Sequence, residues 1–210
     1  MTNGGWPGFA QHNPVERESY QMAKGRESGM PEEAYWQSFF NPECIVSKLD
    51  CSGGDVVEFG CGYGLFTIPA ARLVSGTVYA LDIDPQMIAA TRSHAAKAEC
   101  TNVVALERDF LANGCSRPDS SAAYAMLFNI LHIAEAHELL RETYRVLAPG
   151  GKAGVIHWKL DPSSPRGPSL SIRPHPEQCR AWAEQTGLRF IRREDLCCCS
   201  WHWGMLLEKP

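Results

Sequence analysis

Three glycines at alternate positions follow a strand-like run that holds an acid two residues before the first glycine, and this pattern can bind a nucleotide-like ligand. The run is Val56-Val57-Glu58-Phe59, and the glycines are Gly60, Gly62 and Gly64. Glycine lets the backbone turn sharply, and a ligand can approach closely because no Cβ is in the way. The apolar segment 65–71 is typical of a helix start, whose unpaired N–H groups favour an anionic group such as a carboxylate. The sequence therefore predicts a ligand at a strand–turn–helix corner.

The spacing of these glycines discriminates between nucleotide ligands. The dinucleotide pattern is G-x-G-x-x-G, whereas this chain has G-x-G-x-G, which fits a ligand without a pyrophosphate. A second apolar run, residues 77–81, ends in Asp82, whose carboxylate can accept hydrogen bonds from both ribose hydroxyls. A structural glycine turn in an unrelated α/β protein is the alternative.

At these residues the chain resembles the class I S-adenosylmethionine-dependent methyltransferases. Later motifs match in the family's order and spacing, at residues 107–110, 127–132 and 146–151, so that the resemblance covers roughly residues 43–160. The subgroup it looks most like is a small-molecule type, similar to the ubiquinone/menaquinone-biosynthesis group. The resemblance implies an α/β, Rossmann-like, doubly wound fold, with a mostly parallel seven-stranded sheet and helices on both faces. It also implies S-adenosylmethionine as cofactor and S-adenosylhomocysteine as product.

The resemblance implies roles for residues at the strand ends. Asp82 would hold the ribose, Ile83 would pack on the adenine, and Asp109 would accept a hydrogen bond from the adenine amino group. A helix or turn cap is the alternative for Asp109, and local loop shaping is the alternative for His132. The predicted cofactor-binding residues are Glu58, Gly60, Cys61, Gly62, Gly64, Asp82, Ile83, Met87, Asp109, Phe110, Asn129 and His132.

His157 and Trp158 end the fifth predicted strand. A buried histidine needs a polar partner, but at the carboxyl end of a strand it can face the substrate and take a proton from a hydroxyl, amine or thiol. We therefore predict His157 as a general base and Trp158 as a substrate contact that stacks on an aromatic or cationic group. A core histidine beside a packing tryptophan is the alternative.

Two arginines and a tyrosine complete the predicted substrate site. Arg166 and Arg173 lie in and near a Pro-rich connector, where two guanidinium groups could clamp a carboxylate or phosphate. They favour a small, anionic acceptor, although exposed arginines on a stiff loop would look the same in sequence. Tyr35 belongs to an aromatic segment that could cover the pocket or pack on the sheet.

The elements that must position these residues alternate between strand and helix, which indicates a parallel sheet. The pattern divides the chain into a mobile arm (1–28), with a short helix at 15–24, and a methyltransferase domain (29–210) that includes a helical cap (29–50) and a substrate loop (159–175). Tyr20 and Met22 in the arm are further pocket candidates. Helices are expected at 30–40, 42–49, 64–74, 85–98, 135–147 and 176–186. Strands are expected at 55–59, 78–82, 103–107, 123–128, 152–158, 188–193 and 200–208.

Composition sets the remaining expectations. A chain of 210 residues suits one domain, and a net charge of −4 gives no reason to expect nucleic-acid binding. No apolar run is long enough for a bilayer and the N-terminus has no signal-like segment, so we expect no membrane association and a cytoplasmic location. The small-molecule acceptor is the expected partner, and the chain is expected to be a monomer or a homodimer.

Nine cysteines are many for this length, and none forms a C-x-x-C pair. In a reducing compartment they are expected to act as small, partly buried hydrophobic residues. A soft-metal or thiol-reactive patch formed by Cys197, Cys198 and Cys199 with His202 is the alternative, but a strand would point these side chains to opposite faces. No metal site is predicted.

Three functions remain for comparison. The main prediction is an S-adenosylmethionine-dependent methyltransferase that acts on a small molecule by in-line transfer, for which alignment and a dry cavity are the main requirements. A nicotinamide-dependent oxidoreductase is disfavoured by the glycine spacing. A cofactor-binding regulatory protein without catalysis is compatible with the same cofactor motifs.

Overall fold

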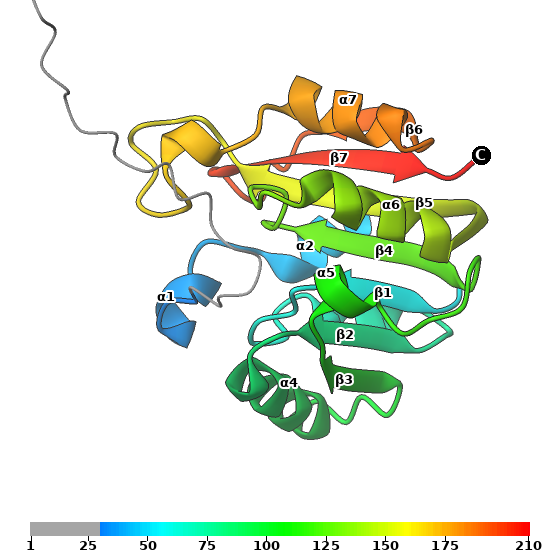
Figure 1. Cartoon of the computed structure of the whole chain (residues 1–210). Coiled ribbons are helices and arrows are strands. Elements are labelled where there is room, and N and C mark those ends of the chain that lie inside the picture. Colours follow the sequence, from blue (N-terminus) through cyan, green and yellow to red (C-terminus); the bar gives the residue numbers. More distant parts are fainter. Residues whose placement is uncertain (1–29) are drawn as a thin grey trace, which may run out of the picture.

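The computed structural model describes residues 30–210, and its centre is a seven-stranded sheet (Figure 1). The strand order is β3-β2-β1-β4-β5-β7-β6. The first five strands in sequence pair in parallel, and β7 runs antiparallel to both β5 and β6. The strands are β1 (Val56–Phe59), β2 (Val78–Asp82), β3 (Val103–Glu107), β4 (Ala122–Phe128), β5 (Leu147–Trp158), β6 (Arg189–Glu194) and β7 (His202–Glu208). The predicted α/β, mostly parallel sheet is confirmed.

Helices cover both faces of this sheet. One group of contacting helices contains α2 (Pro42–Lys48), α3 (Thr67–Leu73) and α4 (Pro85–Lys97), and the other contains α5 (Phe110–Asn113), α6 (Ala136–Val146) and α7 (Pro176–Gln185). The two larger apolar clusters lie beneath them, one with Ile45 and Ala70 and the other with Leu139 and Ala183. The sheet therefore separates two cores, as expected for a doubly wound fold.

The alternation of side chains along β1 decides what lies under the glycine turn. Val57 and Phe59 join the core beneath α6 and α7, while Val56 joins the core beneath α2 and α3. Successive strand residues face opposite sides, so Glu58 shares the side of Val56. Its carboxylate accepts a hydrogen bond from the Thr67 hydroxyl on α3.

Local capping explains where the helices on this side begin. Proline stands at the start of α2 and of α4, where its missing N–H costs no helical hydrogen bond. The side chain of Asn41 accepts a hydrogen bond from the amide of Cys44, and that of Asp84 accepts one from the amide of Gln86. The Asp84 cap fixes the start of α4 directly after the end of β2, which is where the sequence predicts that a ribose binds.

Two irregular segments lie at the carboxyl ends of the parallel strands. Figure 1 shows α1 (Glu33–Gln37) and the connector after β5, residues 159–175, at this end of the sheet. The helix predicted over 30–40 is only Glu33–Gln37 long, and the connector holds a short 3-10 helix, η1 (Leu170–Ile172), that the sequence did not indicate. The predicted arm, with its helix at 15–24, Tyr20 and Met22, lies outside the described residues.

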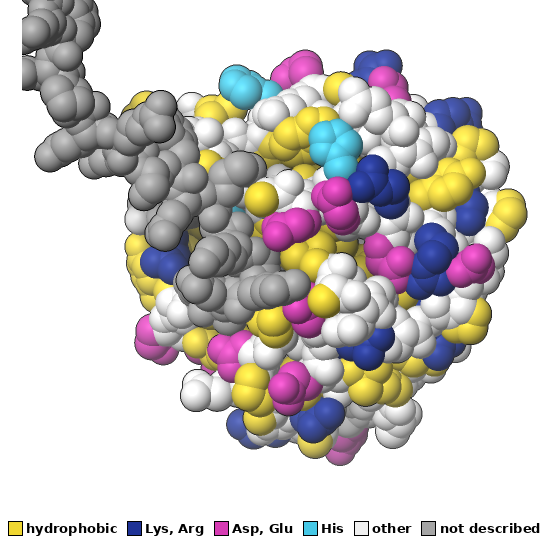
Figure 2. Space-filling view, in the orientation of Figure 1, with side chains coloured by type: hydrophobic (Ala, Val, Ile, Leu, Met, Phe, Trp, Pro, Cys, Tyr) yellow, Lys and Arg dark blue, Asp and Glu magenta, His cyan; other side chains and the backbone are white. Residues whose placement is uncertain are grey.

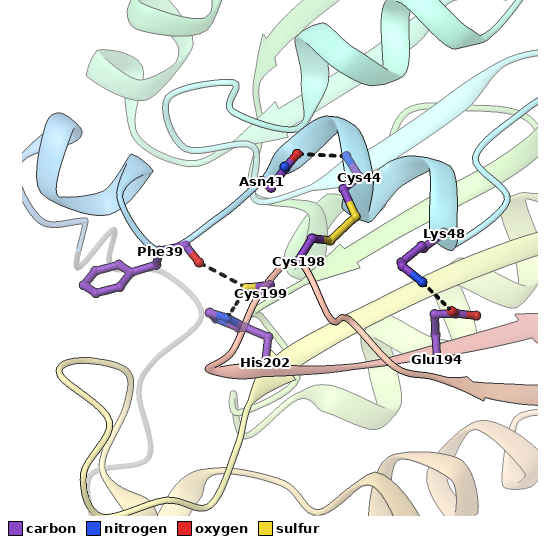
Figure 3. The surroundings of a disulfide bond; sticks show 8 residues. All are labelled: Phe39, Asn41, Cys44, Lys48, Glu194, Cys198, Cys199 and His202. Carbon is purple, nitrogen blue, oxygen red and sulfur yellow. Dashed lines mark hydrogen bonds and ion pairs between the residues drawn. A yellow bond between two sulfur atoms is a disulfide. The ribbon is translucent and has the colours of Figure 1, made fainter.

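The cysteine prediction is wrong for one pair. Cys44 at the start of α2 forms a disulfide with Cys198, which lies in the turn between β6 and β7 (Figure 3), with a Cα–Cα distance of 6.5 Å. The sequence missed it because the partners are 154 positions apart and the three-cysteine run is a turn rather than a strand. Other free cysteines do behave as small buried residues: Cys51, Cys61, Cys115, Cys179 and Cys199 are buried.

The surroundings of the disulfide are tightly packed. The Cys199 thiol lies 3.1 Å from the carbonyl oxygen of Phe39 and 3.0 Å from Nδ1 of His202 (Figure 3). Burial raises the pKa of this thiol to about 11. Between residues 30 and 210, no group of three or more His, Cys, Asp or Glu side chains is placed to hold a metal ion.

The face of the molecule in Figure 2 carries charges of both signs. On the face in Figure 2, the Lys and Arg side chains are scattered among Asp and Glu side chains. Among the helices of residues 30–210, none has the length and apolar character that a bilayer crossing requires. A disulfide is most common in oxidising compartments, so the cytoplasmic location stays a prediction that Cys44–Cys198 does not favour.

Candidate active site

A cavity of about 540 Å³ opens at the carboxyl ends of the parallel strands. In open α/β sheets this edge is where ligands bind. Its wall combines the turn after β1, the ends of β2, β4 and β5, the segment before α1, and the connector. The lining residues are Met30, Pro31, Trp36, Gly60, Cys61, Gly62, Leu65, Phe66, Asp82, Ile83, Phe110, Phe128, Asn129, Ile130, His132, Ile133, Trp158, Arg166, Gly167, Pro168, Ser169 and Ile172.

The glycine turn and the end of β2 form one corner of the cavity. One oxygen of the Asp82 carboxylate accepts a hydrogen bond from the amide of Gly62 at 2.8 Å, and the other accepts one from the amide of Asp84 at 3.0 Å. A carboxylate has about four acceptor positions, so positions remain for two hydroxyl groups of a ligand. Burial raises the pKa of Asp82, and the backbone N–H groups of Asp84 and Gly62 oppose this effect.

Gly62 is the glycine that this corner requires. Its φ is +52°, in the region that favours glycine. A Cβ there would lie 3.0 Å from Cε of Met30, so the cap packs directly on the turn. The hydroxyl of Tyr63 also donates to the carbonyl of Pro31 at 2.8 Å.

Asn129 supplies an unpaired polar group at the base of the cavity. Its φ is +56°, and it follows β4. Both the amide nitrogen and the amide oxygen of its side chain are buried with no hydrogen-bond partner among residues 30–210. Unpaired buried polar groups are costly, so a ligand with donors and acceptors of its own would stabilise this position. A cofactor with an amino and a carboxylate group fits this requirement.

Four predicted cofactor residues lie outside the cavity wall. Glu58 is 2% exposed and bonded to Thr67, and burial raises its pKa to about 8. A Cβ on Gly64 would meet Thr91 of α4 rather than the cavity. Met87 is buried in α4, and the Asp109 side chain caps α5 by accepting from the amide of Ala112. Each of these residues therefore contacts, caps or belongs to helix α3, α4 or α5.

The two histidines meet, but only one reaches the cavity. His132, after β4, lines the wall, and its Nδ1 lies 3.3 Å from Nε2 of His157. His157 is fully buried, because the alternation of β5 turns it toward Trp203 on β7 while its neighbour Trp158 faces the cavity. The predicted base is therefore corrected: His157 lies behind His132, and His132 is the histidine that a ligand can touch.

Several large aromatic side chains also line the cavity. Trp158 lies at ring-centroid distances of 5.3 Å from Phe39 and 4.2 Å from His202. Trp36, Phe66 and Phe128 add further ring faces to the wall. Trp36 belongs to the aromatic segment that the sequence offers as a pocket cover, whereas Phe66 and Phe128 were not predicted as site residues. Phe128 ends β4 and could have been found by the strand-end rule that identified Asn129.

The connector arginines have different roles. Arg166 lines the cavity, as predicted for a substrate residue. Arg173 does not: its guanidinium donates to the carbonyls of Pro168, Lys159 and Arg166 and to the Ser164 hydroxyl. All of these partners belong to its own loop, so Arg173 is corrected from a ligand clamp to the residue that shapes the connector.

Tyr35, which was predicted to contact the substrate, does not line the cavity. Its side chain is 44% exposed and its hydroxyl donates to the carbonyl of Pro165 at 3.3 Å. The residue beside it, Trp36, faces the cavity instead. Tyr35 thus joins the cap to the connector on the outer side.

The comparisons with known proteins agree with this geometry. Residues 56–151 match the family model of a methyltransferase domain. A ribosomal protein L11 methyltransferase of Aeromonas hydrophila is 36% identical over 111 residues, which are 53% of this chain and 35% of that protein. The corresponding protein of Vibrio cholerae is 33% identical over 112 residues, 52% of this chain and 35% of its own length. The chain thus spans about a third of the length of these curated relatives.

Solved structures show the same fold over most of the chain. An S-adenosylmethionine-dependent methyltransferase from Aquifex aeolicus has a TM-score of 0.71 at 21% identity, covering 85% of this chain and 94% of that one. A geranyl diphosphate methyltransferase has a TM-score of 0.68 at 12% identity, covering 87% and 93%.

The strand order, the glycine turn with Asp82 and the matched segment agree with one another. Residues 56–151 are similar to a methyltransferase domain, and the fold is that of solved S-adenosylmethionine-dependent methyltransferases. The residues present fit S-adenosylmethionine as a cofactor: Asp82 has acceptor positions for the ribose, Gly60 and Gly62 have no side chain that would keep the ligand from the backbone, and Asn129 offers its unpaired amide. The likeness to the ubiquinone/menaquinone-biosynthesis group stays a prediction.

Proposed function

We propose that the protein transfers the methyl group of S-adenosylmethionine to a small molecule bound in the cavity. The observation that carries this proposal is that Asp82, Gly62 and the unpaired Asn129 line the same cavity as the aromatic side chains of Trp36 and Trp158. When bound, S-adenosylmethionine supplies a methyl group on a sulfonium, which reacts by in-line displacement. The protein has to align the acceptor and exclude water.

The two walls divide this work. Asp82 anchors the sugar and so fixes the cofactor along the strand ends. Trp158 and Trp36 hold an acceptor with apolar or aromatic surface, since stacking on large rings stabilises such ligands. Arg166 adds a positive charge to the wall and supports an acceptor with an anionic group.

A small molecule is the acceptor that the cavity supports best. The relatives named as ribosomal protein L11 methyltransferases match about half of this chain, and the match leaves most of their own length uncovered. The acceptor wall, in contrast, includes Met30, Pro31 and Trp36 from the cap and residues 166–169 from the connector. A protein side chain that reaches between them is the second candidate acceptor.

Calorimetry tests the proposal. The protein should bind S-adenosylmethionine and S-adenosylhomocysteine, and NAD⁺ should give no heat, because the glycine spacing does not suit a pyrophosphate. Incubation with a set of small hydroxylated and amino compounds should then yield S-adenosylhomocysteine. Heat with NAD⁺ alone would favour an oxidoreductase. Tight cofactor binding with no turnover on any small molecule or ribosomal protein would favour the regulatory alternative.

A further inference from the structure

The Cys44–Cys198 disulfide joins the start of α2 to the turn between β6 and β7 (Figure 3). Cys44 and Cys198 are both half-buried, whereas the free cysteine that follows them, Cys199, is buried. A disulfide that solvent reaches is open to attack by a thiolate, while a buried structural disulfide resists reduction. This cross-link therefore has the accessibility that exchange with an external thiol requires.

The turn that holds Cys198 contacts the aromatic side chains of the acceptor wall. The thiol of Cys199 donates to the carbonyl oxygen of Phe39 at 3.1 Å. His202, which begins β7, has ring-centroid distances of 4.6 Å to Phe40 and 4.2 Å to Trp158. Trp158 lines the cavity. A path of direct contacts thus leads from the disulfide turn to the space where the acceptor is proposed to bind.

The other half of the disulfide is continuous with the cap. Cys44 lies in the first turn of α2, and its amide donates to the side-chain oxygen of Asn41 at 3.1 Å. The ring of Phe40, directly before this helix cap, lies 4.8 Å from the ring of Trp36, which lines the cavity. A shift of the start of α2 therefore reaches the acceptor wall through Phe40 and Trp36.

The far end of α2 is held without the disulfide. Arg192 of β6 donates to both carboxylate oxygens of Asp50, at 3.0 and 3.1 Å, and to the carbonyl of Lys48 at 2.9 Å. Nζ of Lys48 also lies 3.6 Å from the carboxylate of Glu194 (Figure 3), and Leu49 is fully buried. Loss of the disulfide therefore frees the end of α2 that adjoins the cap, while the other end stays attached to β6.

The neighbouring cysteines are poorly suited to open the disulfide from within the chain. Burial raises the pKa of Cys199 to about 11, so near neutral pH it is a thiol and not the thiolate that attacks a disulfide. Cys197 is exposed and free, but adjacent residues have Cα atoms about 3.8 Å apart, closer than the roughly 4.4–6.8 Å of a disulfide. Attack of Cys197 on Cys198 is therefore disfavoured, and the geometry favours a thiol from outside the chain.

We propose that Cys44–Cys198 is a site of thiol–disulfide exchange and that its redox state controls the acceptor wall, an effect on methyl transfer that rests on the proposed function. A thiolate of the reductant attacks one sulfur of the pair, and the S–S bond breaks with its electron pair on the other sulfur, which takes up a proton. A second thiol of the reductant attacks the mixed disulfide, so that the reductant leaves as a disulfide and the second cysteine leaves as a thiolate that takes up a proton. The cofactor corner stays in place, because the amides of Gly62 and Asp84 hold Asp82.

Trapping of thiols in the full-length protein tests the exchange. The protein is equilibrated in glutathione buffers with increasing ratios of the reduced to the oxidised form, alkylated with N-ethylmaleimide and analysed by peptide mass spectrometry. We expect Cys44 and Cys198 to become labelled together while the circular dichroism spectrum stays native. At least about half of the molecules should be reduced in a buffer poised like a reducing cytosol. A cross-link that opens only on unfolding, or that does not form in air, would overturn the proposal.

Hydrogen exchange tests the control of the acceptor wall. Reduction should accelerate amide exchange at least about tenfold in peptides from residues 36–44 and 195–201, and it should leave peptides that contain Gly60 and Gly62 unchanged. Cys44→Ser should show the reduced pattern in every buffer, and Cys197→Ser should respond as the unmodified protein does. No acceleration on reduction, equal acceleration in the glycine turn, or a Cys197→Ser variant that no longer responds would each contradict the proposal.

Calorimetry and activity keep the two hypotheses distinguishable. Both redox forms should bind S-adenosylmethionine with affinities within about threefold of each other. For any acceptor that the oxidised form methylates, reduction should raise KM at least about fivefold. An unchanged KM would overturn the redox control while the proposed function stands. If neither redox form binds the cofactor, the proposed function fails, and the trapping and hydrogen-exchange results still decide whether the disulfide is an exchange site that controls the wall.

Discussion

The two walls of the cavity are built in opposite ways. The cofactor wall comes from short, continuous stretches of chain, mainly residues 60–62 and 82–83, and backbone amides fix it. The acceptor wall is assembled from segments more than a hundred residues apart, the cap near Trp36 and the connector near Arg166. A local motif can therefore define the cofactor site, while the acceptor site depends on how distant segments are held together.

The supports of the two walls differ accordingly. Two amide donors and the adjoining helix α4 hold Asp82. The cap is held on one side by the Tyr63–Pro31 hydrogen bond and on the other by the Cys44–Cys198 disulfide and the ring contacts of Phe39 and Phe40. Cutting the disulfide should thus affect the acceptor wall more than the cofactor wall.

Removal of the disulfide is the largest expected effect. Cys44→Ser, or reduction with dithiothreitol, should lower the free energy of unfolding by about 2–4 kcal/mol, since a cross-link over a long loop constrains the unfolded chain. Urea unfolding measures the loss. Hydrogen exchange should accelerate in peptides from residues 30–49 and 195–201.

Cys197→Ser is the matched control for this prediction. Cys197 is exposed and free, directly beside Cys198, so its substitution should leave stability unchanged within about 0.5 kcal/mol. Equal acceleration of exchange in peptides that contain Gly60 and Gly62 would contradict the difference between the two walls.

Substitution of Asp82 should give the next largest effect, which is on cofactor affinity rather than on stability. Asp82→Asn should weaken S-adenosylmethionine about 10- to 100-fold, because a hydrogen bond to a charged group contributes about 1.5–3 kcal/mol. Calorimetry measures the affinity. Arg166→Ala, on the acceptor wall, should leave the affinity within about twofold, and an equal loss in both variants would mean that the walls do not act separately.

The difference between the walls also decides what the sequence can reveal. β2 and β3 were predicted with their observed bounds, and Gly60, Gly62, Asp82, Ile83 and Phe110 were predicted on the wall that they line. Each of these follows from a local pattern: an apolar run, a turn glycine, an acid at a strand end. The doubly wound topology follows from the alternation of such patterns.

Residues whose roles depend on distant contacts were not predictable in this way. Arg173 and Arg166 look alike in sequence, and only the carbonyls around Arg173 show that it shapes its own loop. His157 does not reach the cavity that His132 lines, because the register of β5 against β7 places His157 opposite Trp203. The disulfide depends on a turn that brings Cys198 to α2, which no spacing rule indicates.

The buried titratable groups near the two walls should change the free energy of unfolding with pH in opposite directions. Burial raises the pKa of Glu58, behind the cofactor wall, to about 8. Between the unfolded pKa of about 4.5 and this value the folded chain binds one more proton than the unfolded chain, so stability falls as pH rises, by up to about 1.4 kcal/mol per pH unit. Glu58→Gln should remove this fall, which urea unfolding at about pH 6.5 and 8 measures.

The buried histidines His132 and His202 have the opposite effect on the pH dependence of stability. Burial lowers the pKa of His132 to about 4 and that of His202 to about 3. Below the unfolded value of about 6.5 the unfolded chain binds protons that the folded chain does not, so this stability is lost as pH falls. Glu58→Gln should keep this acid-side loss, and a variant that lost both slopes would show that the two walls do not titrate independently.

Tyr35 gives the smallest expected effect and the finest test of the acceptor wall. Its hydroxyl donates to the Pro165 carbonyl at 3.3 Å from a half-exposed side chain, a geometry in which water can replace the bond. Tyr35→Phe should change stability by less than about 0.5 kcal/mol and leave cofactor affinity unchanged. Trp36→Leu, one residue further, removes a ring that faces the cavity and packs 4.8 Å from Phe40, and it should cost about 2–4 kcal/mol. A larger loss in Tyr35→Phe than in Trp36→Leu would mean that the outer contact between cap and connector, rather than the inner aromatic packing, holds the acceptor wall in place.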